Sequence, residues 1–367
     1  MGWARGVLSW WLPFIAYSYR LRSKQHSLIN RVESHISTEF SRETLSFVVR
    51  KGRRLFGALT PLCNRAARVS CIEKPTSRWV VMIMGKYVIV VESGSDVTPE
   101  LCERYGIVRV PMHVTIGDET VEDGSIDPLE IYSRCNEFGV MPKTSGCSPA
   151  DFAHVYDRIH AEQPDATILH LAYSEVTTCS HQSSKIAAAG RDYVFSMDTR
   201  FVSVGQSLVA VETAKYIEAH PDATVDEIFA FTNSVMDRVL LGFVPTDLAF
   251  LKAGGRLSNV AFLGAHLLKI KPCIEVTGGK FVATKKLRGS MLKCARAFID
   301  HMVAKGDIDY SHIGLAYSVG LSEELRADME VYAHELGFKD VTWTQVGGVI
   351  SSHCGPTAFG AVLTLKA

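Results

Sequence analysis

The sequence predicts a two-domain α/β protein, with a mostly parallel sheet in residues 84–245 and a mixed, more antiparallel sheet in residues 246–367. Three observations support this prediction. Strand and helix patterns alternate up to about residue 219, helix starts of one chemical kind recur among them, and hairpin-like patterns follow after about Asp247. In such a fold a ligand is expected in the crevice at the carboxyl ends of the strands.

The first domain begins with the strand-like run KYVIVVE at residues 86–92. Three helix starts follow, in which a capping residue precedes proline and an acid lies in the first turn, as the helix dipole favours. They begin at Thr98-Pro99, Asp127-Pro128 and Ser148-Pro149. The other predicted elements are strands at 107–117, 167–173 and 193–198 and helices at about 150–161, 178–189 and 203–219.

The second domain begins near the glycine-bearing turn LKAGGRLSN. CIEVTGGKFVATKKL predicts a hairpin that turns at Gly278-Gly279. The remaining predicted elements are strands at 312–318, 341–353 and 359–367 and a helix at 321–336.

The composition excludes several classes of protein. Of 367 residues, 47% are hydrophobic and 21% are charged, as in folded globular chains. No apolar run reaches the roughly 18 residues of a membrane-spanning helix. Residues 1–83 carry 14 Lys and Arg against 4 Asp and Glu, a net charge of +10, and the rest of the chain carries −10. Two pieces of different composition are therefore joined.

Residues 1–83 are predicted to be a basic extension that arises from a start codon assigned too early, with the true start at Met82 or Met84. Disorder and a peripheral anchor are the alternatives. The apolar run after Gly6 fits an anchor or a signal-peptide core, but Pro13 interrupts any helix and no small-residue cleavage site follows. For the protein we expect no nucleic-acid partner and at most transient membrane contact.

The nine cysteines show no Cys-x-x-Cys or Cys/His ligand spacing. We therefore expect neither a metal site nor a disulfide framework, and free thiols fit a cytoplasmic location. The chain also lacks the GxSxG, GxxxxGK[ST] and GxGxxG patterns of nucleophile and nucleotide sites. No cofactor is expected.

Three polar clusters lie just after strand-like segments, and ESGSD at residues 92–96 is the first of them. KTSGCSP contains Thr144 and Ser145, and SEVTTCSHQSS contains Thr178. Hydroxyls close to helix N-termini can hold a carboxylate by hydrogen bonds, although each residue alone is typical of a cap or a turn. Arg256 follows two glycines in KAGGRLS, and His353 precedes a Gly-Pro turn in SSHCGPTAFG.

Taken in order, these segments resemble the DegV family. The family patterns DSTSDL, TSQPSPxxF, SSGLSGTYQSA, LxKGGRIS, GxLLxIKP and HxGPGAxG correspond here to ESGSDV, TSGCSPADF, SEVTTCSHQSS, LKAGGRLS, GAHLLKIKP and HCGPTAFG. A strand end in MDTRFVSVGQSL and a (K/R)xR stretch in KKLRGS complete the set. The resemblance covers residues 84–367.

The resemblance implies a protein that encloses one long-chain fatty acid between two α/β domains. It implies a non-catalytic subunit that presents the fatty-acid carboxylate to a separate ATP-dependent fatty acid kinase, whose acyl-phosphate product feeds phospholipid synthesis. Carboxylate binding maps onto Thr144, with Ser145 beside it, and Thr178. Kinase coupling or proximity to the head group maps onto Arg256, His353 and Arg288.

The chain also departs from the family pattern. Thr178 replaces serine, Cys179 replaces the following glycine, and Glu175 brings a negative charge near the expected carboxylate site. Two alternatives follow. One is a hydrolase or acyltransferase with Thr144, Thr178 or Cys179 as nucleophile and His353 as base. The other is an anion-binding or regulatory module without lipid.

Overall fold

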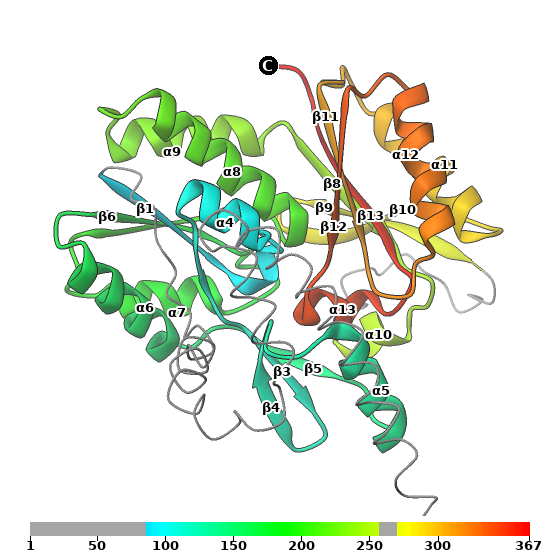
Figure 1. The fold of residues 1–367 in the computed structure, drawn as a ribbon, viewed down its shortest axis with the longest axis horizontal. Coiled ribbons are helices and arrows are strands. Elements are labelled where there is room, and N and C mark those ends of the chain that lie inside the picture. Colours follow the sequence, from blue (N-terminus) through cyan, green and yellow to red (C-terminus); the bar gives the residue numbers. More distant parts are fainter. Residues whose placement is uncertain (1–85, 257–269) are drawn as a thin grey trace, which may run out of the picture. The chain divides into compact units, whose positions relative to one another are not determined.

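A computed structural model describes residues 86–256 and 270–367, all of which lie in the unit Trp79–Ala367. The predicted extension at 1–83 and the proposed start at Met82 or Met84 lie outside the described residues. So does most of the segment GAHLLKIKP. The predicted α/β class is confirmed by one parallel sheet and one mixed sheet, accompanied by a small antiparallel sheet (Figure 1).

The first sheet has four parallel strands in the order β2-β1-β6-β7. Every residue of β1 is buried, as expected for a parallel strand that is covered on both faces. The strands are β1 (Tyr87–Glu92), β2 (Val108–Val110), β6 (Thr167–Ala172) and β7 (Val194–Asp198).

Helices cover both faces of this sheet (Figure 1). Successive side chains of β1 point to opposite faces, so Val88 and Val90 pack on α6 and α7, whereas Ile89 and Val91 pack on α4, α8 and α9. The helices are α4 (Pro99–Tyr105), α6 (Pro149–Glu162), α7 (Ser180–Ala188), α8 (Ser203–Ala219) and α9 (Val225–Met236).

A small antiparallel sheet, β4-β3-β5, follows β2 in the chain. It consists of β3 (His113–Ile116), β4 (Glu119–Glu122) and β5 (Lys143–Ser145), with helix α5 (Pro128–Phe138) before β5. The predicted single strand at 107–117 is therefore wrong. The strand is interrupted at Pro111, which has no N–H to donate to a neighbouring strand. The segment before it, β2, joins the parallel sheet, and the segment after it, β3, joins the small antiparallel sheet.

The mixed sheet has six strands in the order β10-β9-β8-β13-β11-β12. Only β11 and β12 pair in parallel; the other neighbours are antiparallel. The strands are β8 (Val239–Val244), β9 (Lys271–Thr277), β10 (Lys280–Leu287), β11 (His312–Tyr317), β12 (Asp340–Gln345) and β13 (Phe359–Thr364). Strand β8 precedes residue 246 and nevertheless pairs within this sheet.

The two faces of the mixed sheet have different partners. One face packs on α11 (Met291–Val303) and α12 (Glu323–Glu335), where Phe298 and Met329 are fully buried. The other face, which includes Leu241 and Phe281, packs toward Val202 and Val204 around the start of α8. This second face forms part of the cavity wall described below.

The local predictions are confirmed at the helix starts and at the hairpin. Thr98 and Asp127 cap their helices, Ser148 forms a capping box with Asp151, and the hairpin turns at Gly278-Gly279. The predicted strand at 341–353 is wrong in its second half. It ends with β12, and residues Gly348–Cys354 form the short helix α13.

In residues 86–256 and 270–367, no helix combines the length and apolar character needed to cross a membrane.

Candidate functional site

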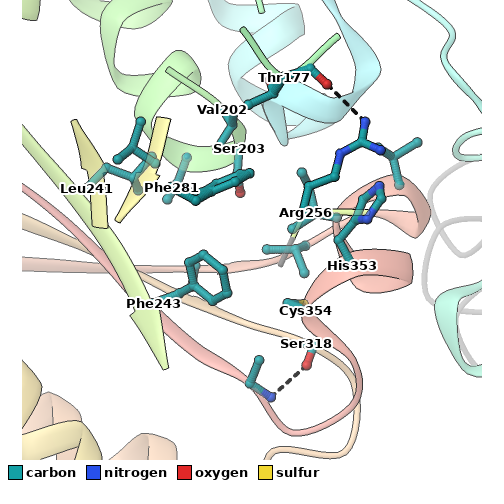
Figure 2. A pocket seen from close by; sticks show the side chains of 18 of the residues that line it. Thr177, Val202, Ser203, Leu241, Phe243, Arg256, Phe281, Ser318, His353 and Cys354 are labelled. Carbon is teal, nitrogen blue, oxygen red and sulfur yellow. Dashed lines mark hydrogen bonds between the residues drawn. The ribbon is translucent and has the colours of Figure 1, made fainter. Parts of the chain in front are cut away.

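A cavity lies against the inner face of the mixed sheet (Figure 2). Its wall is completed by the start of α8, the loop after β6, the end of β5 and helix α13. The space between its walls is about 870 Å³, including the part that is open to solvent.

Most of the wall is apolar. Strand β8 contributes Leu241 and Phe243, β9 contributes Val276 and β10 contributes Phe281. The rings of Phe243 and Phe281 meet edge to face, with centroids 6.1 Å apart. This part of the cavity can bury a hydrocarbon chain but offers nothing to hold a charge.

The polar residues gather elsewhere on the wall. Thr144 on β5 and His353 on α13 lie 2.7 Å apart, measured from Oγ1 to Nε2. Thr178 and Arg256 line the same cavity. Figure 2 shows His353 beside Arg256, away from Phe243 and Phe281. The cavity therefore has one polar end and one aromatic end.

His353 is neutral at physiological pH. Burial and the charge of Arg256 lower the pKa of its imidazole to about 3. Its Nδ1 is buried and has no hydrogen-bond partner among the described residues. A Cβ at residue 254 would lie 2.6 Å from Cε1 of His353, so Gly254 is what allows the loop after α10 (Ala249–Ala253) to lie against the ring.

Arg256 is positioned by backbone carbonyls. Its guanidinium donates to the oxygen of Gly254 at 2.7 Å and to that of Thr177 at 2.9 Å, and the second of these bonds is drawn in Figure 2. Within the described residues no carboxylate forms an ion pair with Arg256, and it is the one charged residue among those that line the cavity. Its charge is therefore available to an anion.

Thr178 lies close to the end of β5 because residue 146 is glycine. A Cβ there would lie 2.6 Å from Oγ of Ser180 and would also clash with Oγ1 of Thr178. Oγ1 of Thr178 accepts a hydrogen bond from the amide of Ser180 at 3.3 Å. Oγ1 of Thr178 also lies 3.1 Å from Oγ of Ser180, and either hydroxyl can be the donor of that bond. When Ser180 donates, the hydroxyl hydrogen of Thr178 is available to a ligand.

Buried carboxylates of the ESGSD segment support the wall. Glu92 accepts hydrogen bonds from the amide of Tyr173 and from Gln206, each at 2.8 Å. Asp96 accepts one from the amide of Gly347 at 2.8 Å and one from the hydroxyl of Ser203. These contacts tie the loop after β1 to the loop after β6, to the start of α8 and to the segment before α13.

The structure brings four of the predicted site residues to one cavity: Thr144, Thr178, Arg256 and His353. Ser145 and Arg288 do not line it, and both are exposed. Ser145 follows Thr144 on the same strand, so its side chain points to the opposite face. Glu175, the charge that departs from the family pattern, is exposed and lies 3.0 Å from Nδ1 of His181.

The geometry disfavours a hydrolase. Thr144 is within reach of His353, but among the described residues nothing orients Nδ1 of the imidazole, and its lowered pKa makes it a weak base. Cys179 is exposed and does not line the cavity. The described residues also hold no cluster of three or more His, Cys, Asp or Glu side chains that could bind a metal ion.

Several residues of the site were not found from the sequence. Thr177 positions Arg256 through its carbonyl, Ser203 lines the cavity, and Phe243 and Phe281 form its aromatic end. Alternating hydrophobicity reveals that such aromatic residues face inward, but it does not reveal that they face a cavity rather than a packed core.

Known proteins resemble this chain over the described region. The family described as "Uncharacterised protein, DegV family" matches residues 86–366. A DegV domain-containing protein of Deinococcus radiodurans is 30% identical over 281 residues, which cover 75% of this chain and 97% of that protein. A fatty acid-binding protein of Thermotoga maritima is 28% identical over 288 residues, which cover 75% and 96% of the two chains.

A solved structure gives the same result. It describes fatty acid binding by a DegV family protein from Thermus thermophilus, and it matches with a TM-score of 0.67 and 29% identity. The match covers 77% of this chain and all of that one, 100%. From the family match, these relatives and the shared fold, the chain belongs to the DegV family.

Proposed function

We propose that the protein binds one long-chain fatty acid and presents its carboxylate to a separate ATP-dependent kinase. The observation that carries this proposal is a cavity with a largely apolar wall and a polar end, where neutral hydroxyls lie beside Arg256, which pairs with no carboxylate of the described residues. Relatives that bind fatty acids support it. The acyl-phosphate product would feed phospholipid synthesis in the cytoplasm, and this chain would catalyse no step itself.

The apolar wall supplies the affinity. Burial of a methylene group contributes roughly 0.8 kcal/mol, so a chain of about 15 such groups contributes roughly 12 kcal/mol before the costs of ordering are subtracted. The polar end then needs only to orient the head group. Residues 84–245 and 246–367 would act as the two domains that enclose the ligand, except that β8 pairs within the sheet of the second.

The polar end suits a carboxylate that must react. Thr144 and Thr178 would donate hydrogen bonds to it, and such neutral donors leave it more nucleophilic than a bidentate arginine clamp would. Arg256, held by two backbone carbonyls, would stabilise the charge that develops on the transferred phosphoryl group. His353 would keep the Thr144 hydroxyl oriented without adding a charge of its own.

Native mass spectrometry of the full chain, purified from a bacterial host, tests the proposal. We expect one fatty acid per chain, identified after extraction. Ala316→Phe, which places a ring in the cavity from β11, should purify empty or with a shorter acid. The matched control Val331→Phe adds the same ring at an exposed position on α12 and should retain the lipid. A wild-type protein that is empty and takes up no added fatty acid would refute the proposal.

A further inference from the structure

One hydroxyl lies on the cavity wall among apolar residues. Ser203 is the first residue of α8, and its neighbours Val202 and Val204 line the cavity with it. Figure 2 shows it beside Val202, and in this view it falls between Phe281 and Arg256. It is 7% exposed, so a polar group placed there has lost its water.

The serine is held by a buried carboxylate. Its hydroxyl donates to Asp96, whose other oxygen accepts the amide of Gly347 at 2.8 Å. When Asp96 is ionised, the serine has used its hydrogen and can only accept a hydrogen bond from a ligand. When Asp96 is protonated, it can donate to the serine, which then donates into the cavity. Burial raises the pKa of Asp96 to about 7, so both protonation states occur near neutral pH. A hydroxyl group on the ligand suits both states, because it can donate and accept a hydrogen bond.

The backbone beside the serine also lacks acceptors. The first amides of a helix have no acceptor within the helix, and the residue that precedes α8, Val202, offers no side-chain cap. Among the described residues, the amides of Ser203 and Val204 donate to no other group. These amides would favour an oxygen atom in the ligand near the serine.

Two other hydroxyls on the wall, those of Ser318 and Thr177, already donate to backbone carbonyls. Ser318 donates to the carbonyl of Gly355 at 2.7 Å and accepts the amide of Ala358 at 2.8 Å. Thr177 donates to the carbonyl of Ser174 at 2.9 Å. Thr144 and Thr178 belong to the polar end. Ser203 differs from Ser318 in that no described group donates a hydrogen bond to its oxygen.

We propose that the ligands of this cavity include long-chain fatty acids that carry a hydroxyl group partway along the chain, seated on Ser203. This inference rests on the proposed fatty-acid function and narrows its ligand class. An apolar tunnel rejects a hydroxyl wherever the hydroxyl finds no partner, because its desolvation is then uncompensated. Ser203 would remove that penalty at one position of the chain.

A positional series tests the inference. The full chain is titrated with saturated fatty acids of one length that carry a single hydroxyl at successive carbons, by displacement of a fluorescent fatty acid. We expect one isomer to bind about tenfold more tightly than the isomers whose hydroxyl meets only apolar wall. In Ser203→Ala this isomer should fall to the level of the others, with each affinity measured relative to that of the unsubstituted acid in the same variant.

A second variant guards against misfolding. Ser203 has a φ of 49°, a conformation that glycine adopts without strain, so Ser203→Gly removes the hydroxyl and keeps the backbone. Equal binding of all isomers, or a preference that survives in both variants, would overturn the inference and leave fatty-acid binding intact. Failure of the unsubstituted acid to bind would overturn both proposals.

Discussion

At the scale of single residues, the polar end of the cavity combines a neutral imidazole with hydroxyl groups. Nε2 of His353 lies 2.7 Å from Oγ1 of Thr144, and the lowered pKa of His353 keeps the ring uncharged. Among the described residues of the cavity wall, Arg256 alone therefore supplies a positive charge. In the proposed function, the hydroxyls would orient the carboxylate, and Arg256 would stabilise the charge on the transferred phosphoryl group.

Removal of the hydroxyls of Thr144 and Thr178 should leave fatty-acid binding intact and impair presentation of the carboxylate to the kinase. In Thr144→Val with Thr178→Val, we expect the fatty acid to stay bound because the acyl chain supplies most of the affinity. Acyl-phosphate formation by the cognate kinase should fall at least roughly 10- to 100-fold, since even one hydrogen bond to a charged group contributes about 1.5–3 kcal/mol. The measurement is acyl phosphate formed per bound lipid.

The matched control for this pair is Thr144→Ser with Thr178→Ser. It keeps both hydroxyls and loses only methyl groups, so it should retain most of the wild-type rate. Unchanged phosphorylation in the valine pair would contradict the roles given to the two threonines.

The sequence predicted the chemistry of this end better than its geometry. Thr144, Thr178, Arg256 and His353 stood in recognisable segments and converge on one cavity. Ser145 had the same local signal as Thr144, but strand alternation turns it away. Ser203 stood within the recognised segment MDTRFVSVGQSL, but nothing there marked it as a site residue, because its partner, Asp96, lies 107 residues earlier in the chain.

At the scale of elements, the sequence predicted best where capping chemistry or a glycine pair marked a boundary. The helix starts at Thr98, Asp127 and Ser148 and the hairpin turn are of this kind. Helix α13 was missed because an apolar run as short as VGGVISSH fits a strand or a helix equally well. Tertiary contacts decide between them: Asp96 and Asp123 accept the amides of Gly347 and Val349 at the start of this helix.

The approach of α10 to α13 depends on the absence of a side chain at residue 254. Gly254 has helical backbone angles, with φ −76°, so alanine fits the backbone there but clashes with the ring of His353. Gly254→Ala should lower the free energy of unfolding by about 1–3 kcal/mol, as overpacking does. In the His353→Ala background the same substitution should cost less than about 1 kcal/mol. Denaturant unfolding of the four proteins measures both.

Lys252→Ala is the matched control for this cycle. Lys252 is exposed on the same helix, and its substitution should change the free energy of unfolding by less than about 0.5 kcal/mol. If Gly254→Ala costs the same with and without the imidazole, the clash lies with backbone and not with His353.

At the scale of the whole molecule, the cavity is assembled from segments that are distant in the chain. Thr144 comes from the small sheet, Val202 from the start of α8, and Phe281 from the outer hairpin of the mixed sheet. Alternation of strands and helices predicted that sheets form. It did not predict that β8 pairs with β13 and β9, because local sequence patterns do not show which distant strands are neighbours. A ligand that fills this space would contact all of these segments at once.

Bound fatty acid should therefore slow hydrogen exchange in the small antiparallel sheet and in the mixed sheet. Ligand that binds only the folded state stabilises it by mass action, and we expect slower exchange of amides in β5 and residues 177–178 together with β8, β9 and β10. Stripped and reloaded protein would be compared by hydrogen–deuterium exchange and mass spectrometry. Helix α12 packs on the far face of the mixed sheet, so local opening there should change least and serves as an internal control. Protection confined to the hairpin would show that the ligand lies on one sheet and does not reach the polar end, because a chain whose carboxylate meets Thr144 and Thr178 must order both sides of the cavity.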